Sequence, residues 1–364
     1  MNICFNFIKI VAAISVFLLH FAIFAFRTGK CDIQSLPTWL FTPAWTGVWI
    51  FFILSGFLIG KGFWTGKYKT DNLKDFSKFY TNRALKILPL YFFIVILDVL
   101  FINTNMYFNG SETLSRVLTF RLRNPFVNPM IGNLWFISTI VQLYLLTPFV
   151  WKFILNPISK LKNSKIFLVI LMSLLTFGFY GLRIYWWNNN VSWDYFILCH
   201  IIANLDLFFV PFIFSKFTEE QTDTKLKKIL RYTLIPIIII FFITNTYFMQ
   251  KVITQGIFQE LVKIDFTTYT LILLLVIFFA YDVSSQYIKE GMSKIKTIII
   301  KTINWGGAIA FSFYACHCQI MHKTLSIFKN DWISALCFTI IFNLVWAIFL
   351  HYFIEKPFIK RKIQ

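Results

Sequence analysis

The sequence predicts an all-α polytopic membrane protein, a bundle of about ten transmembrane helices. Of its 364 residues 58% are hydrophobic, and the mean hydropathy is +0.68. Apolar stretches of about 20 residues recur from end to end, which is the length that a helix needs to cross ~30 Å of hydrocarbon. Lipid leaves the backbone only helices or a closed barrel, and these stretches are too long for barrel strands.

The predicted spans follow one another with short connections. We therefore expect a single membrane domain over residues 1–364 and no separate soluble domain. The first span has almost no basic flank and is too long for the apolar core of a signal peptide, so we expect it to be retained. In chain order, the predicted spans cover residues 3–26, 41–60, 84–102, 131–151, 166–182, 195–214, 230–249, 266–281, 298–321 and 332–354.

Basic residues are distributed unevenly between alternate connections. The chain carries 35 Lys and Arg against 16 Asp and Glu, a net charge of +19. The even-numbered connections and the C-terminal tail together hold 21 basic residues, and the odd-numbered connections hold 10. By the positive-inside rule both termini are predicted to be cytoplasmic. The charge is thus a topology signal, and because the basic residues are dispersed we expect no nucleic-acid partner.

The six cysteines predict neither a disulfide framework nor a metal site. Five of them fall within predicted spans, and only Cys31 lies in an outer connection. The triplet Cys316, His317 and Cys318 contains metal-ligating residue types. However, successive side chains on a helix project about 100° apart, so we expect no metal to be bound there.

A layer of polar side chains is predicted in the outer part of the membrane. His20 lies ~25 Å along the first span, in an otherwise apolar run, and an ionisable group at such a depth is a functional-site candidate. His317, Trp135 and Asp98 are predicted at similar heights on other spans. Structural interpretations remain open for each of these residues: a histidine in a helix-packing interface, or a tryptophan of the aromatic belt.

A second, cationic layer is predicted near the cytoplasmic surface. It consists of Arg83 and Lys86 at the start of the third span and of Lys9 in the first span. These side chains are either binding groups for an anionic substrate or interfacial anchors that extend to water.

Five segments, in order, are similar to one family. Together they span nearly the whole chain, and the chain resembles the integral-membrane acyltransferases of acyltransferase family 3, which O-acetylate bacterial surface glycans and related acceptors. The LWFI and YLLTP strings are most similar to the branch that includes the enterobacterial common antigen O-acetyltransferase. The segments are the stretch from Lys9 to His20, GVWIFFILSGFLIG at 47–60, NRALKILPLYF from Asn82, GNLWFISTIVQLYLLTPFV at 132–150, and FSFYACH at 311–317 followed by IEKPFIKR at 354–361.

The resemblance implies transfer of an acyl group, usually acetyl, from cytoplasmic acyl-CoA to an acceptor hydroxyl on the outer side of a bacterial inner membrane. The acyl-CoA is a donor substrate, and no tightly bound cofactor is expected. The implied partners are a carbohydrate or glycolipid acceptor and the lipid bilayer. His20 stands where the family has its essential first-span histidine. By depth alone, Asp98 is a candidate orienting partner for it, and Asp206, near mid-membrane on the sixth span, is a second candidate. The imidazole would serve either as general base or as covalent acyl carrier.

The resemblance also implies a donor site and a reaction chamber. Arg83 matches the first arginine of the family's paired basic motif, while Lys86 replaces the second and Lys9 stands where the family often has arginine. Lysine keeps the charge but loses the bidentate fork that suits phosphate. The chamber is expected to be lined by Trp135, Tyr314, His317 and Ser55.

Proteins with two other functions would also have many spans and polar residues buried within them. One is a transporter or flippase for lipid-linked sugars, and the other is a noncatalytic subunit for polysaccharide export. Transporters often contain internal repeats, and the two halves of this sequence show no convincing correspondence. The acyltransferase hypothesis is therefore preferred.

Overall fold

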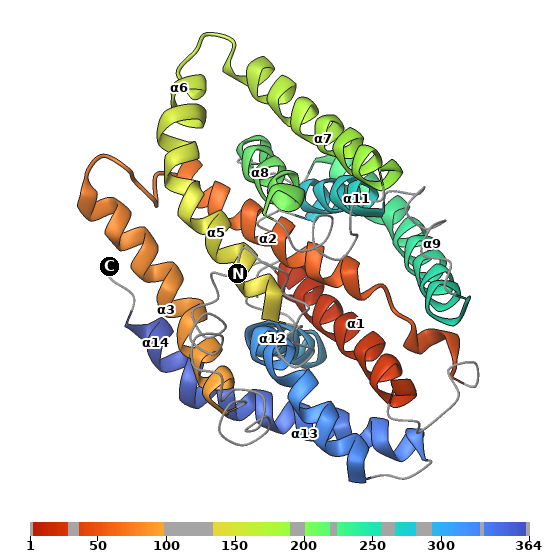
Figure 1. Ribbon diagram of the computed structural model, residues 1–364. Helices are drawn as coiled ribbons and strands as arrows, with labels where there is room; N and C mark the ends of the chain where they lie inside the picture. Colours follow the sequence, from red (N-terminus) through yellow and green to blue (C-terminus); the bar gives the residue numbers. More distant parts are fainter. Residues whose placement is uncertain are drawn as a thin grey trace. The chain divides into compact units, whose positions relative to one another are not determined.

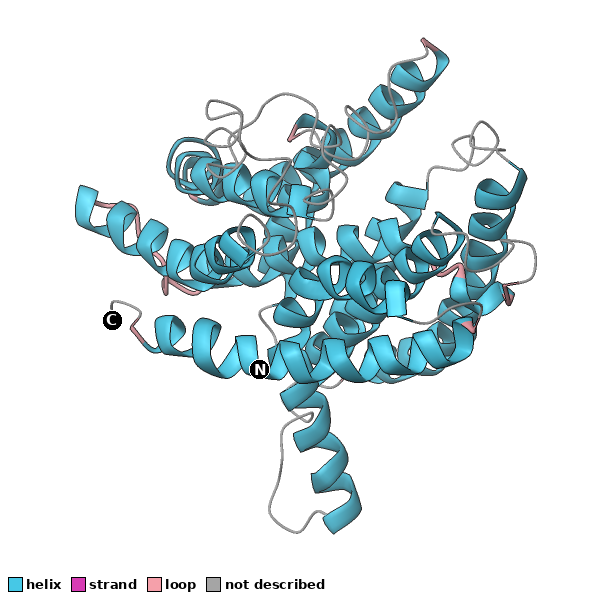
Figure 2. Cartoon of the chain, turned by 60° about the horizontal axis from the view of Figure 1, so that its bottom comes forward, coloured by secondary structure: helices cyan, strands magenta, loops and turns pink. Residues whose placement is uncertain are grey.

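The computed structural model describes residues 3–27, 36–97, 134–189, 201–218, 224–255, 266–281, 293–327 and 331–361. Within these ranges the chain is helical apart from short turns, and no strand occurs (Figure 2). This confirms the predicted all-α class. Asp98, the candidate orienting residue, lies outside the described residues.

Each of the ten predicted spans contains part of one long helix. The bounds differ from the predicted ones by up to 11 residues at a single end, because polar first and last turns extend several helices beyond their apolar cores. The helices are α1 Ile3–Arg27, α2 Ala44–Trp64, α3 Leu73–Leu97, α5 Trp135–Val150, α7 Ser164–Asn188, α8 Leu205–Phe214, α9 Lys225–Gln255, α11 Phe266–Tyr281, α12 Lys294–Ile327 and α13 Trp332–Leu350, with short helices α6 Asn156–Ser159 and α14 Lys356–Lys360.

Seven of the described helical segments are long and apolar enough to cross a membrane. They contain α1, α2, α3, α5, α7, α12 and α13. Of the other three predicted spans, α8 has 10 described residues and α11 has 16, short of the ~20 that a span needs. Helix α9 is 31 residues long but carries polar residues toward both ends. The chain is thus a polytopic membrane protein.

The chain divides into two compact units. The first contains residues 1–54 and 217–347, and the second contains residues 55–216 and 348–364. The division falls within the continuous helices α2 and α13. Each unit is described by itself below.

In the first unit, α1 and α12 pack side by side although they come from opposite ends of the sequence (Figure 1). Glycines on α12 allow this approach. A Cβ added at Gly307 would lie 2.5 Å from Asn6, and one at Gly306 would lie 2.8 Å from Ile10. At the same level the amide nitrogen of Asn6 donates a hydrogen bond to Asn304 Oδ1 over 2.8 Å. Small residues at helix interfaces and interhelical hydrogen bonds are the usual means of helix association in lipid.

In the second unit, α2 packs equally closely against α8. A Cβ at Gly56 would lie 2.0 Å from the carbonyl oxygen of Phe208, and one at Gly60 would lie 2.3 Å from that of Phe212. The indole nitrogen of Trp64 donates to Phe212 O over 3.0 Å. The glycines of α2 are therefore a packing requirement, as the sequence GVWIFFILSGFLIG suggests.

A buried ion pair links α7 to α8 in the same unit. Arg183 donates through Nη2 to Asp206 Oδ2 over 2.9 Å and through Nη1 to Oδ1 over 3.2 Å. The side chains are 4% and 0% exposed. A bidentate geometry of this kind is the arrangement that offsets the cost of burying both charges.

The glycine contacts predict a difference between two Gly→Ala substitutions. Gly56→Ala places a methyl group against a backbone carbonyl, so we expect a loss of about 1–3 kcal/mol, as for other overpacked sites. In α7, a Cβ added at Gly178 would have no atom within 4 Å. Gly178→Ala is expected to be neutral or to stabilise by up to about 1 kcal/mol, because alanine is the better helix former. Thermal unfolding of both variants in detergent measures the difference, and equal melting temperatures would refute the packing role.

The buried ion pair predicts non-additive substitutions. Arg183→Met alone leaves the Asp206 carboxylate buried without its partner, and we expect a loss of about 3–5 kcal/mol. The double variant Arg183→Met/Asp206→Leu removes both charges and is expected to be more stable than the single variant. Unfolding in sodium dodecyl sulfate, followed by circular dichroism, gives both values. A double variant less stable than Arg183→Met would show that the pair does not act as a unit.

Candidate functional site

Two histidines from opposite ends of the sequence meet in the first unit. His20 Nδ1 on α1 lies 3.0 Å from His317 Nε2 on α12, and the ring centroids are 4.9 Å apart. His317 is completely buried and His20 is half-buried. The close packing of α1 against α12 brings these two imidazoles together.

The hydrogen bonds of the pair define which ring nitrogen carries each proton. His317 Nδ1 donates to the carbonyl oxygen of Tyr314, so the lone pair of the neutral ring is on Nε2. His20 Nδ1 lies 3.0 Å from Val16 O and 3.0 Å from His317 Nε2, both of which are acceptors. Nδ1 of His20 therefore carries its hydrogen, and its Nε2 holds the lone pair that a base or nucleophile needs.

Aromatic side chains surround His317. The centroids of the Tyr314 and His317 rings are 5.7 Å apart, and those of Phe17 and His317 are 6.5 Å apart. Phe51 packs against Tyr314 with 5.7 Å between centroids. The predicted chamber residues Tyr314 and His317 thus do lie together, in a largely apolar environment.

Asn343 of α13 supports this part of α12 and was not identified from the sequence. Its amide nitrogen donates to Phe313 O over 3.3 Å, and its Oδ1 accepts from the Cys316 thiol over 3.1 Å. Asn343 and Cys316 are both fully buried. An asparagine in an apolar helix is the signal that could have identified it, because such a residue needs a partner.

Cys318 approaches the histidine pair, contrary to the expectation for successive side chains. Its Sγ lies 3.3 Å from His317 Nε2. The ligand atoms of His20, His317 and Cys318 all lie within 4.8 Å of one another. The argument from helical projection holds for Cys316, which faces Asn343, but a short thiol side chain can approach the far nitrogen of the preceding imidazole.

Arg83 lies among aromatic side chains of the second unit. It donates from Nη2 to the Tyr68 hydroxyl, and its guanidinium lies 5.3, 5.6 and 6.0 Å from the ring centroids of Tyr68, Phe79 and Tyr144. The Nε atom is buried and has no hydrogen-bond partner among the described residues. Such an arrangement combines cation–π attraction with a fixed orientation of the guanidinium.

The remaining predicted site residues occupy several places. Ser55 interacts with the Tyr144 hydroxyl and so belongs to the surroundings of Arg83. Lys86 is half-buried one turn after Arg83 on α3. Trp135 begins α5 in the second unit. Lys9 is half-buried on α1, about 16 Å before His20 along the helix.

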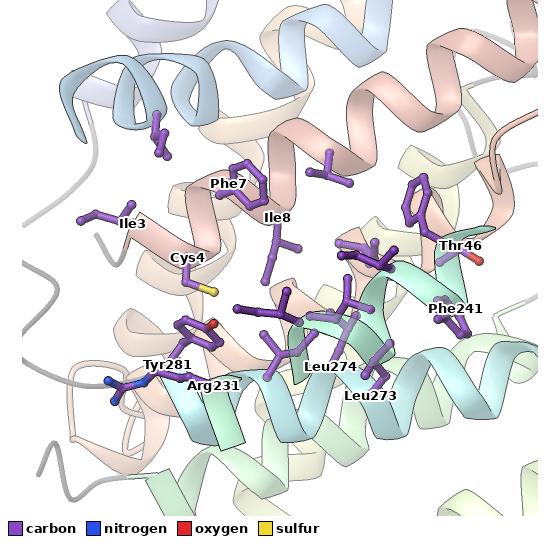
Figure 3. A pocket seen from close by; sticks show the side chains of 18 of the residues that line it. Ile3, Cys4, Phe7, Ile8, Thr46, Arg231, Phe241, Leu273, Leu274 and Tyr281 are labelled. Carbon is purple, nitrogen blue, oxygen red and sulfur yellow. The ribbon is translucent and has the colours of Figure 1, made fainter. Parts of the chain in front are cut away.

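A cavity of about 750 Å³ lies in the first unit between α1, α2, α9, α11 and α12. Figure 3 shows Cys4, Arg231 and Tyr281 toward one end, with Thr46 and Phe241 toward the other. The lining is mainly isoleucine, leucine and phenylalanine and includes none of the predicted site residues. The cavity is suited to an apolar chain, and the ionisable side chains in its lining are those of Cys4, Arg231, Tyr281 and Lys296.

One comparison with known proteins gives a result. A family model described as an acyltransferase domain matches residues 2–352. Neither the search of curated proteins nor the search of solved structures found a match.

Proposed function

The chain belongs to the acyltransferase domain family and is an acyltransferase enzyme, and on this premise we propose that it transfers an acetyl group from cytoplasmic acetyl-CoA to a hydroxyl of a surface glycan or of its lipid-linked precursor. The LWFI and YLLTP strings support assignment of the chain to the branch that includes the enterobacterial common antigen O-acetyltransferase. The unequal distribution of basic residues supports an inner-membrane location with both termini in the cytoplasm.

The observation that carries the proposal is the hydrogen-bonded pair of His20 and His317. In this pair His20 Nε2 has the lone pair needed to accept the proton of the acceptor hydroxyl. As the hydroxyl oxygen bonds to the acyl carbon, the carbon–sulfur bond of the thioester breaks, and the proton passes to the coenzyme A thiolate. An acyl-histidine route would use the same nitrogen and the same tautomer.

His317 is a positioning residue in this scheme. Its Nε2 accepts the His20 Nδ1 hydrogen and so holds the ring in the reactive tautomer. The Tyr314 carbonyl in turn holds His317. This is the role that the third member of a catalytic triad plays, here taken by a neutral imidazole.

Arg83, Lys86 and Lys9 are proposed to bind the phosphates of the donor. Coenzyme A is a polyanion, and guanidinium and ammonium groups bind phosphate by charge-assisted hydrogen bonds. The buried Nε of Arg83, which has no partner among the described residues, supports this assignment because it is a donor that a ligand can use.

Substitutions at the histidine pair test the mechanism. His20→Ala is expected to abolish transfer of radiolabelled acetyl groups by the purified protein. His317→Leu is expected to lower kcat by about 10²–10⁴, the usual range for loss of acid–base catalysis, with little change in the KM for acetyl-CoA. His317→Gln is expected to recover part of kcat, since its amide oxygen can accept the His20 hydrogen.

In cells, His20→Ala is expected to remove glycan O-acetylation while protein level and glycan export stay normal. Unchanged acetylation would overturn the catalytic assignment. Lost export with normal acetylation would favour a flippase instead.

Donor binding is tested by removing one positive charge at a time. Arg83→Leu is expected to raise the KM for acetyl-CoA about ten- to hundredfold, because a hydrogen bond to a charged group contributes about 1.5–3 kcal/mol. Lys152→Leu is the matched control: Lys152 belongs to the same unit and lies over the Phe76 ring, 5.5 Å from its centroid. The same rise in KM for both variants would indicate a general charge effect rather than a phosphate site.

A further inference from the structure

We propose that His20, His317 and Cys318 form a binding site for the soft monovalent ion Cu⁺, and that an ion bound there switches off the histidine that transfers the acyl group. The proposal that Cu⁺ binds is based on the geometry of the three side chains. The proposal that bound Cu⁺ inhibits acyl transfer rests on the proposed function of His20.

The three potential ligand atoms are already gathered at nearly the right separations. His317 Nε2 lies 3.0 Å from His20 Nδ1 and 3.3 Å from Cys318 Sγ, and all three atoms lie within 4.8 Å of one another. Nitrogen and sulfur atoms that share one metal ion at bond lengths of about 2.0 and 2.3 Å are about 3.3–3.8 Å apart. The two contacts at His317 Nε2 would lengthen by a few tenths of an ångström to admit an ion, and His20 Nδ1 and Cys318 Sγ, which lie within 4.8 Å of each other, would move to a similar separation.

The hydrogen bonding around His317 Nε2 also points to an ion. This nitrogen has one lone pair, yet both the His20 Nδ1 hydrogen and the Cys318 thiol approach it. One lone pair cannot accept two good hydrogen bonds, whereas one metal ion can bind all three groups. On the other side of the ring, His317 Nδ1 donates to Tyr314 O, which is the backbone contact typical of a metal-binding histidine.

The donor set selects the class of metal. One thiolate and two imidazoles suit Cu⁺ or Zn²⁺, whereas Mg²⁺ and Ca²⁺ require oxygen ligands. The three side chains therefore exclude the hard cations.

Net charge then favours Cu⁺ over Zn²⁺. With one thiolate, Cu⁺ gives a neutral complex and Zn²⁺ leaves a net charge of +1. His317 is fully buried and Cys318 is 7% exposed, so an uncompensated charge at this position is costly. Among the described residues of this unit the one acidic side chain is Asp331, which caps the start of α13 by accepting from the Ser334 N–H.

Binding of the ion would change the tautomer of His20. When Nδ1 binds the ion, it must give up its hydrogen, and a neutral imidazole then carries that hydrogen on Nε2. Nε2 thereby loses the lone pair that acyl transfer requires. The thiol proton of Cys318 is released, so binding of Cu⁺ liberates one proton and involves no redox step.

The test is a titration of the purified full-length protein with Cu⁺ under anaerobic conditions, in competition with a chromogenic Cu⁺ chelator. In this competition we expect each wild-type chain to retain one more Cu⁺ ion than each chain of the Cys318→Ala variant. Cys316→Ala is the matched control, because it removes the adjacent buried thiol, which faces Asn343, and it is expected to bind as the wild type does. X-ray absorption of the loaded protein is expected to show one sulfur and two nitrogen ligands.

Circular dichroism of Cys318→Ala establishes that it is folded, and His317→Gln provides a second variant expected to lose the ion. Equal copper retention by wild type and Cys318→Ala, the same loss in Cys316→Ala, or tighter binding of Zn²⁺ than of Cu⁺ would each overturn the proposal. Acetyl transfer is measured separately: Cu⁺ is expected to inhibit it, and the chelator to restore it. Inactivity of the metal-free protein would count against the proposed function alone, whereas binding without inhibition would overturn the switch.

Discussion

The lack of water inside a bilayer is the constraint on which this structure depends. A polar side chain in hydrocarbon must find its partner on another helix, since solvent cannot supply one. The described part of the chain meets this requirement repeatedly: Arg183 pairs with Asp206, Asn6 with Asn304, and Thr324 with Thr339 at 2.7 Å between hydroxyl oxygens. Each of these contacts joins two helices, so the same polar groups that would destabilise a single helix define which helices are neighbours.

Close helix packing makes such contacts possible, because short side chains meet only when the backbones approach. The Asn6–Asn304 contact occurs where Gly307 allows α12 to approach α1. Along the same two helices, His20 comes within hydrogen-bonding distance of His317. The glycines near one end of the helix pair therefore help to determine the geometry of the imidazoles further along it, although they touch neither ring.

The sequence was sufficient for the parts of this structure that depend on local composition. Runs of apolar residues predicted the ten helices, and the cost of burying an imidazole identified His20. Pairing could not be predicted in the same way: His20 and His317 are 297 residues apart, and their contact depends on which helix faces meet. The approach of Cys318 was missed because an angular rule for successive residues ignores the reach of each side chain. Arg183 was missed because the partner of Asp206 becomes apparent only when α7 and α8 pack together.

The tautomers of the two histidines are determined by the groups around the pair and not by the pair itself. Two neutral imidazoles in contact need one donor and one acceptor nitrogen, and nothing within the pair decides which ring donates. Two backbone carbonyls decide it. Tyr314 O fixes the His317 hydrogen on Nδ1 and Val16 O accepts from His20 Nδ1, so that His20 must donate and its Nε2 must hold the lone pair. The thiol of Cys318 has no part in that relay, yet it lies at the one nitrogen where the relay can be interrupted. The backbone carbonyls of Tyr314 and Val16 therefore set the reactive tautomer, and a single thiol adjoins the nitrogen from which that tautomer can be reversed.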